Sequence, residues 1–482
     1  MENKFKILIS NETFLNRVAI VSENQIEYLF VNRPDLFTGV GNIYKGSIEK
    51  IIHGLNAAFI NIGGPRNGFL PFNKEECIYL EGEHLGKTDK VPIHKHTKGE
   101  EILVQISKPM TDDKGMKLTT HLSIPGRFLV LLPQSPLRTI SKKITDKAER
   151  ERLVSAVTKR IKNNDIGFII RTAAEGQNEK YILREVKILL SFWNKIKRFA
   201  KVKPSPSILW EDLPLYTKII RDFANKNYTE IIVDDVKTYK EVKKYVSIFL
   251  PELNGKVKFY NESTPIFTKY CIEKKIENSL SNKVFLPSGG YLLIEEGETL
   301  NAIDVNTGSS DRNNIRATIF NTNIEAAREI PRQIRIRNLS GLIIVDFIDM
   351  CQEKQRKKVF NEFNANLDID KAQINILSIS KLGLVEMSRE KTEYRLSDVF
   401  MDRCTCCKGN GVLRNIYIEA LMLKNSILNQ LSKNPKKKLS VEVSRDLFEF
   451  SKETLFLDKL IKEKKIFLKE NLFLENGQYK IF

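Results

Sequence analysis

The sequence predicts a multidomain α/β protein that also contains a small β-barrel. A chain of 482 residues, 41% of them hydrophobic, is long enough for roughly three or four domains with their own cores. Between about 37 and 120, short apolar strands are broken by glycines, which is typical of a small barrel. Helical and strand patterns alternate over 213–280 and again over 285–400, which indicates two α/β units.

The other segments are assigned from local composition and periodicity. Polar residues with His and Lys indicate a loop insertion in the barrel, and two prolines indicate a linker. The expected elements are short strands over 1–36, the loop near 74–98, helices over 145–200, the linker at 201–207, helices near 213–225 and 236–249 around a strand at 229–233, and a basic, mostly helical tail over 415–482 that contains Lys436, Lys437 and Lys438.

The charge balance favours a polyanionic partner. The chain has 78 Lys and Arg against 60 Asp and Glu, a formal net charge of +18. Because no apolar stretch approaches the ~20 residues that span a bilayer, nucleic acid is a better partner than a membrane. The six cysteines do not form a disulfide framework, which fits a reducing compartment. We expect the cytoplasm of a bacterium, with the plastid stroma as the alternative.

Two aspartates stand where apolar runs end. Asp304 follows one such run and Asp346 another. The 42 residues between them accommodate a helix over 316–337 that joins two parallel strands, which would bring both carboxylates to one edge of a sheet. Such hard oxygen ligands suit Mg²⁺. The alternative interpretation is that the aspartates cap turns.

Aromatic residues lie beside glycines in the predicted barrel. Phe59 and Phe69 occupy such positions, and single-stranded nucleic acid binds by stacking its bases on rings of this kind within a basic groove. The alternative is that both rings are ordinary core residues. Composition alone does not separate the two.

Nearly the whole chain resembles the ribonuclease E/G family, in its short, ribonuclease G-like form. The barrel segment 41–71 resembles an S1 domain, and eight further motifs follow in the order of the family. They lie at 112–120, 123–133, 167–173, 289–295, 303–308, 342–350, 383–389 and 404–407.

The resemblance implies a division into named domains. These are a ribonuclease H-like scaffold over 1–36 and 213–280, an S1 RNA-binding barrel over 37–120, a 5′ sensor over 121–212, a DNase I-like catalytic domain over 281–400, a zinc-link over 401–414 and a small C-terminal domain over 415–482.

The resemblance also implies an activity. It implies a Mg²⁺-dependent endoribonuclease that is specific for single-stranded RNA, is stimulated by 5′-monophosphate ends, and acts on ribosomal RNA precursors and messenger RNA. Asp304 and Asp346 would hold the Mg²⁺ and Asn306 would support the site, with Glu295 and Asp311 as possible helpers. The residues that would hold the RNA strand in the barrel are Phe59, Phe69 and Lys114.

A 5′-phosphate pocket follows from the same resemblance. Arg171 would grip the phosphate and Thr172 would supply a hydroxyl, with backbone groups of Gly126 and Val130 completing the pocket. Lys142 stands where the family has arginine. Because Lys is a point charge, it does not reproduce a bidentate contact, and weaker discrimination of the 5′ end is expected.

Cys404 and Cys407 form half of a zinc site. Structural zinc needs four ligands, and no second pair of suitable residues follows. Two copies of the chain could donate two thiolates each, in agreement with the zinc link of the family, so a homodimer or homotetramer is expected. Cys406 inside the pair leaves the ligand set open, and His94 and His96 are distant in sequence. A pair of reduced cysteines is the alternative.

Two features of the catalytic segment have competing interpretations. Asp349 and Gln352 have the spacing of a helix cap. Pro331 interrupts a helical pattern, and Arg332, Arg335 and Arg337 beyond it would face either RNA or solvent.

Two rival functions remain open at the level of sequence. A non-catalytic RNA-binding or assembly factor would keep the barrel without cleaving RNA, and a DNA-acting nuclease would use the same metal chemistry. No phosphate-binding loop of the ATPase type occurs, so an ATP-driven helicase is not expected.

Overall fold

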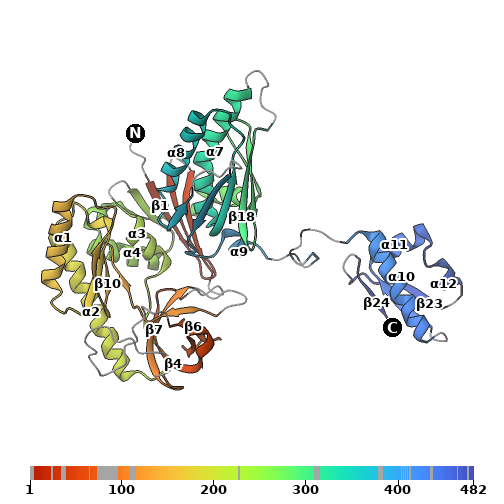
Figure 1. Cartoon of the computed structure of the whole chain (residues 1–482), viewed down its shortest axis with the longest axis horizontal. Coiled ribbons are helices and arrows are strands. Elements are labelled where there is room, and N and C mark those ends of the chain that lie inside the picture. Colours follow the sequence, from red (N-terminus) through yellow and green to blue (C-terminus); the bar gives the residue numbers. More distant parts are fainter. Residues whose placement is uncertain are drawn as a thin grey trace. The chain divides into compact units, whose positions relative to one another are not determined.

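The computed structural model of the chain forms two compact units, Met1–Val399 and Phe400–Phe482. Figure 1 shows the elements of each. The structure describes residues 5–22, 25–33, 39–64, 66–72, 96–108, 115–225, 228–308, 315–377, 384–402, 404, 406–407, 409, 411, 414–434, 438–463, 465–474 and 477–482. Predictions for Lys114, Asp311, His94, Lys436, Lys437 and most of the 74–98 loop lie outside these residues.

The first sheet of the larger unit combines two distant segments of the chain. Its order is β15-β14-β1-β2-β3. The strands are β1 (Phe5–Asn11), β2 (Asn16–Ser22), β3 (Gln25–Asn32), β14 (Tyr228–Val233) and β15 (Val257–Phe259), and the helices of this segment are α3 (Leu215–Phe223), α4 (Val236–Phe249), α5 (Ile266–Lys269) and α6 (Ile272–Leu280). The core joins α3 and α4 to β1 and β14. The two helices and the strand predicted over 213–249 are thus confirmed.

The predicted small barrel is confirmed. Its strands are β4 (Ile43–Ile52), β5 (Ala57–Asn61), β6 (Gly68–Pro71), β7 (Glu101–Lys108) and β8 (Lys117–Thr119), and a 3-10 turn covers His53–Leu55. The order β4-β5-β6-β8-β7 closes because β4 also pairs with β7. A Cβ at Gly46 would lie 2.6 Å from the Ile60 side chain, so glycine permits this close approach of β4 and β5. The closed five-stranded barrel is compatible with an S1 fold.

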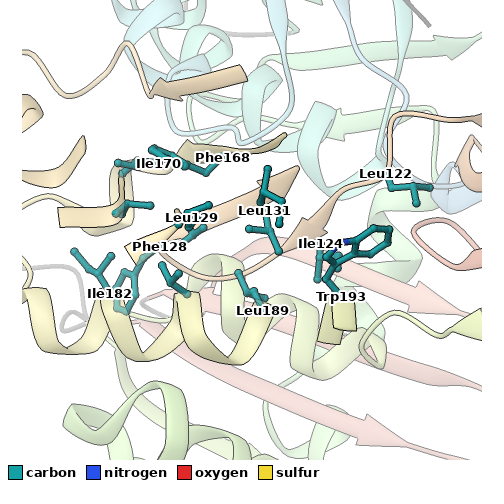
Figure 2. Close-up of a cluster of buried hydrophobic side chains, with 14 of the residues drawn as sticks. Leu122, Ile124, Phe128, Leu129, Leu131, Phe168, Ile170, Ile182, Leu189 and Trp193 are labelled. Atoms are coloured by element: carbon teal, nitrogen blue, oxygen red, sulfur yellow. The ribbon is translucent and has the colours of Figure 1, made fainter. Parts of the chain in front are cut away.

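A four-stranded sheet follows the barrel. Its order is β11-β12-β10-β9, with β9 (Ile124–Pro125), β10 (Leu129–Leu132), β11 (Ser135–Ile140), β12 (Ile166–Ile170), a 3-10 turn (Thr172–Ala174) and the helices α1 (Lys147–Arg160) and α2 (Glu179–Val202). Ile182, Leu189 and Trp193 of α2 pack against the sheet, as Figure 2 shows. The predicted linker joins α2 to β13 (Ser207–Trp210), which extends the barrel sheet at β4, so no unit boundary falls there.

The last sheet of this unit contains both aspartate strands. Its order is β16-β17-β18-β19-β21-β20, with β16 (Lys283–Phe285), β17 (Tyr291–Glu296), β18 (Leu300–Asn306), β19 (Gly341–Asp346), β20 (Ile374–Ile376) and β21 (Leu384–Arg389). The helices are α7 (Ile315–Arg337), α8 (Glu353–Leu367) and α9 (Leu396–Phe400). As predicted, a long helix, α7, connects β18 to its parallel neighbour β19. Ile303 and Val345 face the core with α7 and α8, whereas alternate residues form an open face.

The arginines after Pro331 were expected to face RNA or solvent, and this is wrong for Arg335 and Arg337. The helix continues through Pro331, and Arg335 and Arg337 are buried. Arg335 donates to Glu27 at 2.9 Å, and Arg337 donates to the Ser281 carbonyl at 2.7 Å. Neither faces RNA or solvent, because α7 packs between its own sheet and the first sheet, where a buried arginine needs such partners. Arg332 stays partly exposed and pairs with Glu329.

In the smaller unit, helices cover more residues than strands do, in line with the prediction, but the unit also contains a sheet that was not predicted. Its helices are α10 (Ile416–Lys433), α11 (Arg445–Thr454) and α12 (Asp458–Lys462), and a sheet of order β23-β22-β24 contains β22 (Leu439–Val443), β23 (Ile466–Glu470) and β24 (Tyr479–Ile481). Leu439, Val441 and Val443 alternate with polar residues, the period of a strand with one buried face. No helix within the described parts of the chain has the length and hydropathy to cross a bilayer.

Candidate functional site

Asp304 and Asp346 are direct neighbours across two parallel strands. Asp304 of β18 is the register partner of Asp346, the last residue of β19. Both side chains are exposed on the open face of the sheet. Asn306 Nδ2 donates a hydrogen bond of 2.7 Å to Asp304 Oδ2, which fixes that carboxylate. The structure thus brings the three predicted residues together.

The electrostatics of this pair favour a bound cation. Partial burial raises the pKa of Asp346, and the negative charges of Asp304 and Asp349 raise it further. No lysine or arginine among the described residues forms an ion pair with Asp304 or Asp346. Two adjacent carboxylates without a cationic partner fit Mg²⁺, which takes one or two protein carboxylates and keeps several waters. No cluster of three or more acidic, His or Cys side chains suited to a metal occurs within the described ranges.

Asp349 does not cap a helix. The helix α8 begins at Glu353 and its N-cap is Gln352, three residues after Asp349, so the predicted cap is wrong. Asp349 instead adds negative charge near Asp346. Glu295 is also exposed on the open face. Its register partner is Ala302, two residues before Asp304 on β18, so Glu295 is not the direct neighbour of Asp304.

Phe59 and Phe69 lie outside the core of the barrel. They are register partners on β5 and β6 with ring centroids 5.9 Å apart, and both are half-buried. The core is built from their neighbours Ala58, Ile60 and Leu70, which point the opposite way. The interpretation of the two rings as ordinary core residues is therefore wrong.

Lysines flank this aromatic pair. Lys50 is the register partner of Phe59, and Lys117 is that of Phe69. The row across the barrel surface is therefore cation, ring, ring, cation. Sequence reasoning missed both lysines, because the signal that links them to the phenylalanines is strand register, which becomes known only when the barrel closes.

The predicted 5′-phosphate residues gather around Arg171. Its Nη1 donates to the Gly126 carbonyl at 2.8 Å and to Asp222 Oδ1 at 2.7 Å. The hydroxyls of Thr172 and Ser141 are 3.1 Å apart. Val130 lies on β10 opposite Ile169, and the side chain of Lys142 is exposed beside Ser141. Asp222 on α3 was not predicted, since it lies 51 residues from Arg171.

A buried carboxylate holds the turn that contains Gly126. Glu185 of α2 accepts hydrogen bonds from the backbone amides of Arg127, Phe128 and Leu129 at 2.9, 2.8 and 3.1 Å. Burial raises the pKa of Glu185, although these three bonds oppose the shift. A Cβ at Gly126 would lie 2.3 Å from Glu185 Oε1, so glycine is required here. Sequence reasoning missed Glu185 as well.

Arg171 and Arg221 pair with the Asp222 carboxylate. Lys371, in the loop after α8, donates to the Asp222 carbonyl. The pKa of Lys371 is lowered by burial and further by Arg171, Arg127 and Lys143. The pocket around Arg171 is therefore basic, which suits an anionic ligand.

The predicted zinc thiols lie close together in the smaller unit. Hydrogen bonds from the backbone amides of Cys407 and Cys406 lower the pKa of Cys404, and the Cys407 thiol also contributes. The Gly411 amide donates to Cys407 Sγ at 3.3 Å. His96 belongs to the larger unit, where it is buried and its Nδ1 lies 3.0 Å from Glu100 Oε1. This segment thus offers the thiols of Cys404, Cys406 and Cys407, whereas a structural zinc site takes four ligands.

The family model of the ribonuclease E/G family matches residues 123–392. The chain belongs to the ribonuclease E/G family. It is 34% identical to ribonuclease G of Escherichia coli K12 over 416 residues, which cover 85% of each chain. It is 35% identical to ribonuclease G of Haemophilus influenzae over 411 residues, which cover 84% of this chain and 83% of that relative. Ribonuclease E of Escherichia coli K12 is 34% identical over 432 residues, 89% of this chain and 40% of that relative.

Membership in this family confirms the resemblance that the motifs indicated. The matched segment contains the Arg171 pocket, both aspartates and Asn306. It ends before the cysteine group, so the family match adds nothing about zinc.

Proposed function

We propose that this member of the ribonuclease E/G family is a Mg²⁺-dependent endoribonuclease that cuts single-stranded RNA and is stimulated by a 5′-monophosphate end. Its substrates would be ribosomal RNA precursors and messenger RNA. The observation that carries the proposal is the register pairing of Asp304 and Asp346 on an open sheet face, with Asn306 bonded to Asp304 at 2.7 Å.

Asp304 and Asp346 would hold the metal. When bound, Mg²⁺ would polarise the scissile phosphate and lower the pKa of a coordinated water. Asn306 keeps the Asp304 carboxylate in one orientation through its amide. Asp346 must be ionised to serve as a ligand, and its raised pKa means that it loses its proton at a higher pH than an ordinary aspartate.

Phe59 and Phe69, with Lys114, would hold the RNA strand on the barrel. Base stacking on exposed rings contributes ~1–3 kcal/mol per base and tolerates any sequence. The flanking Lys50 and Lys117 would neutralise phosphates on either side of the rings. The net charge of +18 supports attraction to RNA at low salt.

The 5′ monophosphate would bind at Arg171 and Thr172, with Lys142 and the backbone of Gly126 and Val130 beside them. The Arg171 bonds to Gly126 and Asp222 both use Nη1. Nε and Nη2 of the same guanidinium can then make a bidentate contact with a phosphate.

Cys404 and Cys407 from two copies of the chain would share a structural Zn²⁺, which gives a homodimer or a homotetramer. The relatives named above come from bacteria, and we place the protein in a bacterial cytoplasm. A plastid location has no support from these relatives.

A cleavage assay tests the proposal. The purified protein with Mg²⁺ should cut a 5′-monophosphorylated single-stranded RNA oligonucleotide and leave a matched DNA oligonucleotide intact. Asp346→Asn should lose at least about 100-fold in rate and keep RNA affinity within about twofold. Glu390→Gln is the matched control, because Glu390 is an exposed carboxylate that follows Arg389 at the end of β21 away from Asp346, and it should be neutral. Tight RNA binding without any cleavage by the wild type would support the non-catalytic alternative.

A further inference from the structure

An exposed aromatic pair lies on the same sheet face as the two aspartates. Phe285 at the end of β16 is 72% exposed, and it is the register partner of half-buried Tyr291 on β17. The ring centroids are 6.4 Å apart in an edge-to-face arrangement. An exposed ring next to a second ring offers an aromatic surface on which a planar group can stack.

A lysine completes this group. Lys283 Nζ lies 3.7 Å from the Tyr291 ring centroid and 5.1 Å from that of Phe285. Two rings and a cation are the combination that binds a nucleotide, since the base stacks on a ring and the phosphate meets the charge.

Strand register places this group beside the proposed metal site. Tyr291 pairs with Asn306, and Leu293 pairs with Asp304. Because neighbouring strands lie ~4.8 Å apart, Tyr291 is one strand spacing from Asn306, and Phe285 is roughly 10 Å away. Side chains two residues apart on a strand share a face, so Phe285 and Tyr291 face the same side as Asp304.

The hairpin that carries the rings is held firmly. The Ser288 amide donates to Glu325 of α7 at 2.9 Å. A Cβ at Gly290 would lie 2.7 Å from the Asn306 carbonyl, so this hairpin rests directly on the end of β18. Any movement of the rings relative to Asn306 is therefore limited.

The edge of the sheet beside Phe285 is basic. A cavity of about 630 Å³ lies where β16 meets α6, α7 and β3, and its charged lining residues are Lys275, Lys283, Arg332 and Glu329. Three cations face one carboxylate, and Glu329 is already paired with Arg332. This balance favours the phosphates of a polyanion over an acidic or neutral apolar partner.

We infer that Phe285, Tyr291 and Lys283 form a base-stacking subsite for a nucleotide next to the bond that is cut. This subsite deepens the proposed function and rests on it. Phe285 stacks on the base, Tyr291 supports the Phe285 ring from its edge, and Lys283 neutralises the adjacent phosphate. The subsite lies on the sheet with the aspartates and is therefore distinct from the Phe59 and Phe69 pair on the barrel.

A position scan tests the subsite. Single-stranded RNA oligonucleotides carry one 2-aminopurine at successive positions, and fluorescence is read on cleavage-deficient Asp346→Asn protein with and without Phe285→Ala. Stacking on Phe285 should quench the probe at one position beside the cleavage site, and Phe285→Ala should remove this quenching only there. In the wild-type background, Phe285→Ala should lower kcat/KM by roughly 5- to 100-fold.

Matched variants keep the test interpretable. Phe14→Ala removes a ring that is 70% exposed elsewhere in the same unit and should change neither readout. Phe285→Trp keeps a stacking surface and should restore both. Thermal unfolding should be unaffected by Phe285→Ala, because the ring is exposed.

Three results would overturn the inference or separate it from the proposed function. Equal kcat/KM and equal quenching for Phe285→Ala and Phe14→Ala would exclude the subsite. A change in oligomer size with unchanged quenching would make the rings a contact between copies of the chain and also exclude it. Quenching that depends on Phe285 in a wild-type protein that never cleaves RNA would support the subsite and contradict the nuclease function.

Discussion

Arg171 and Asp222 form an ion pair of 2.7 Å between the predicted phosphate pocket and helix α3. The same Nη1 of Arg171 donates to the Gly126 carbonyl, so one nitrogen anchors the side chain in two directions. Burial raises the pKa of Asp222, but its bonds to Arg221 and Arg171 outweigh burial and lower it overall. Asp222 is therefore a charged anchor at neutral pH.

Asp222→Ala should reduce the preference for 5′-monophosphorylated over 5′-hydroxyl RNA by about tenfold. The reason is that Arg171 loses the partner that orients its free nitrogens, at a cost of about 1–2 kcal/mol for such a bond. The measurement is kcat/KM on the two substrates. Cleavage of the 5′-hydroxyl substrate should not change. If Asp222 acts through Arg171, then Arg171→Ala combined with Asp222→Ala should be no worse than Arg171→Ala alone.

As the pH is lowered, the cleavage rate should begin to fall at a higher pH than it would if Asp346 had the pKa of an ordinary aspartate. Asp346 has a raised pKa because of burial and the charges of Asp304 and Asp349, so it becomes protonated before an isolated carboxylate of pKa ~3.9 does. The single-turnover cleavage rate against pH at saturating Mg²⁺, and again at low Mg²⁺, measures this. The acid limb should move to lower pH as Mg²⁺ rises, because the ion competes with the proton. If the acid limb of the pH profile did not move with the Mg²⁺ concentration, Asp346 would not be a metal ligand.

Repulsion between Asp346 and the nearby Asp304 and Asp349 should lower the folding stability of the metal-free protein. A carboxyl group whose pKa is raised in the folded state stabilises the fold below its unfolded pKa, and this contribution is lost as the pH rises through the folded pKa. At pH 7 without Mg²⁺, Asp346→Asn should therefore slightly raise the Tm. Adding Mg²⁺ should raise the Tm of the wild type and leave that of Asp346→Asn nearly unchanged. Equal Mg²⁺ shifts for both proteins would place the ion elsewhere.

Gly126→Ala should destabilise the larger unit by about 1–3 kcal/mol, because the new methyl group would meet Glu185 Oε1 at 2.3 Å and backbone as well. Urea unfolding monitored by fluorescence of Trp193, which packs in the same core, measures the loss. Gly54→Ala is the control, since nothing lies within 4 Å of its added Cβ. Similar losses for both variants would mean that backbone flexibility, and not the Glu185 contact, explains the effect.

Zinc content should equal about one ion per two chains, and Cys404→Ser or Cys407→Ser should abolish it. Each thiolate pair supplies two of the four ligands that structural zinc requires. Metal analysis and analytical ultracentrifugation measure both quantities, and a chelator should lower the oligomer size of the wild type. Cys271→Ser, at an exposed cysteine outside the group, should change nothing. A full ion per chain in a monomer would refute the shared site.

Local sequence patterns predicted a structural feature correctly where that feature involves one element or two elements that are adjacent in sequence. The helix α4 has the predicted bounds, and the connection from β18 through α7 to parallel β19 follows from its length and two apolar runs. They failed where two patterns compete. Asp349 has the spacing of a cap, yet α8 begins only at Glu353. The alternation over 439–443 is only five residues long, and a neighbouring helical pattern concealed it.

The sequence by itself determined that two carboxylates lie near the ends of two neighbouring parallel strands and that an amide follows two residues after the first, because strand period and connection length are properties of contiguous residues. Only the tertiary structure decided that Asp222 holds Arg171, that Glu185 holds the Gly126 turn, that Arg335 and Arg337 are buried, and that Phe285 and Tyr291 share a face with Asp304. These relationships join residues from separate elements, and which elements pack together depends on burying the apolar faces of the whole unit.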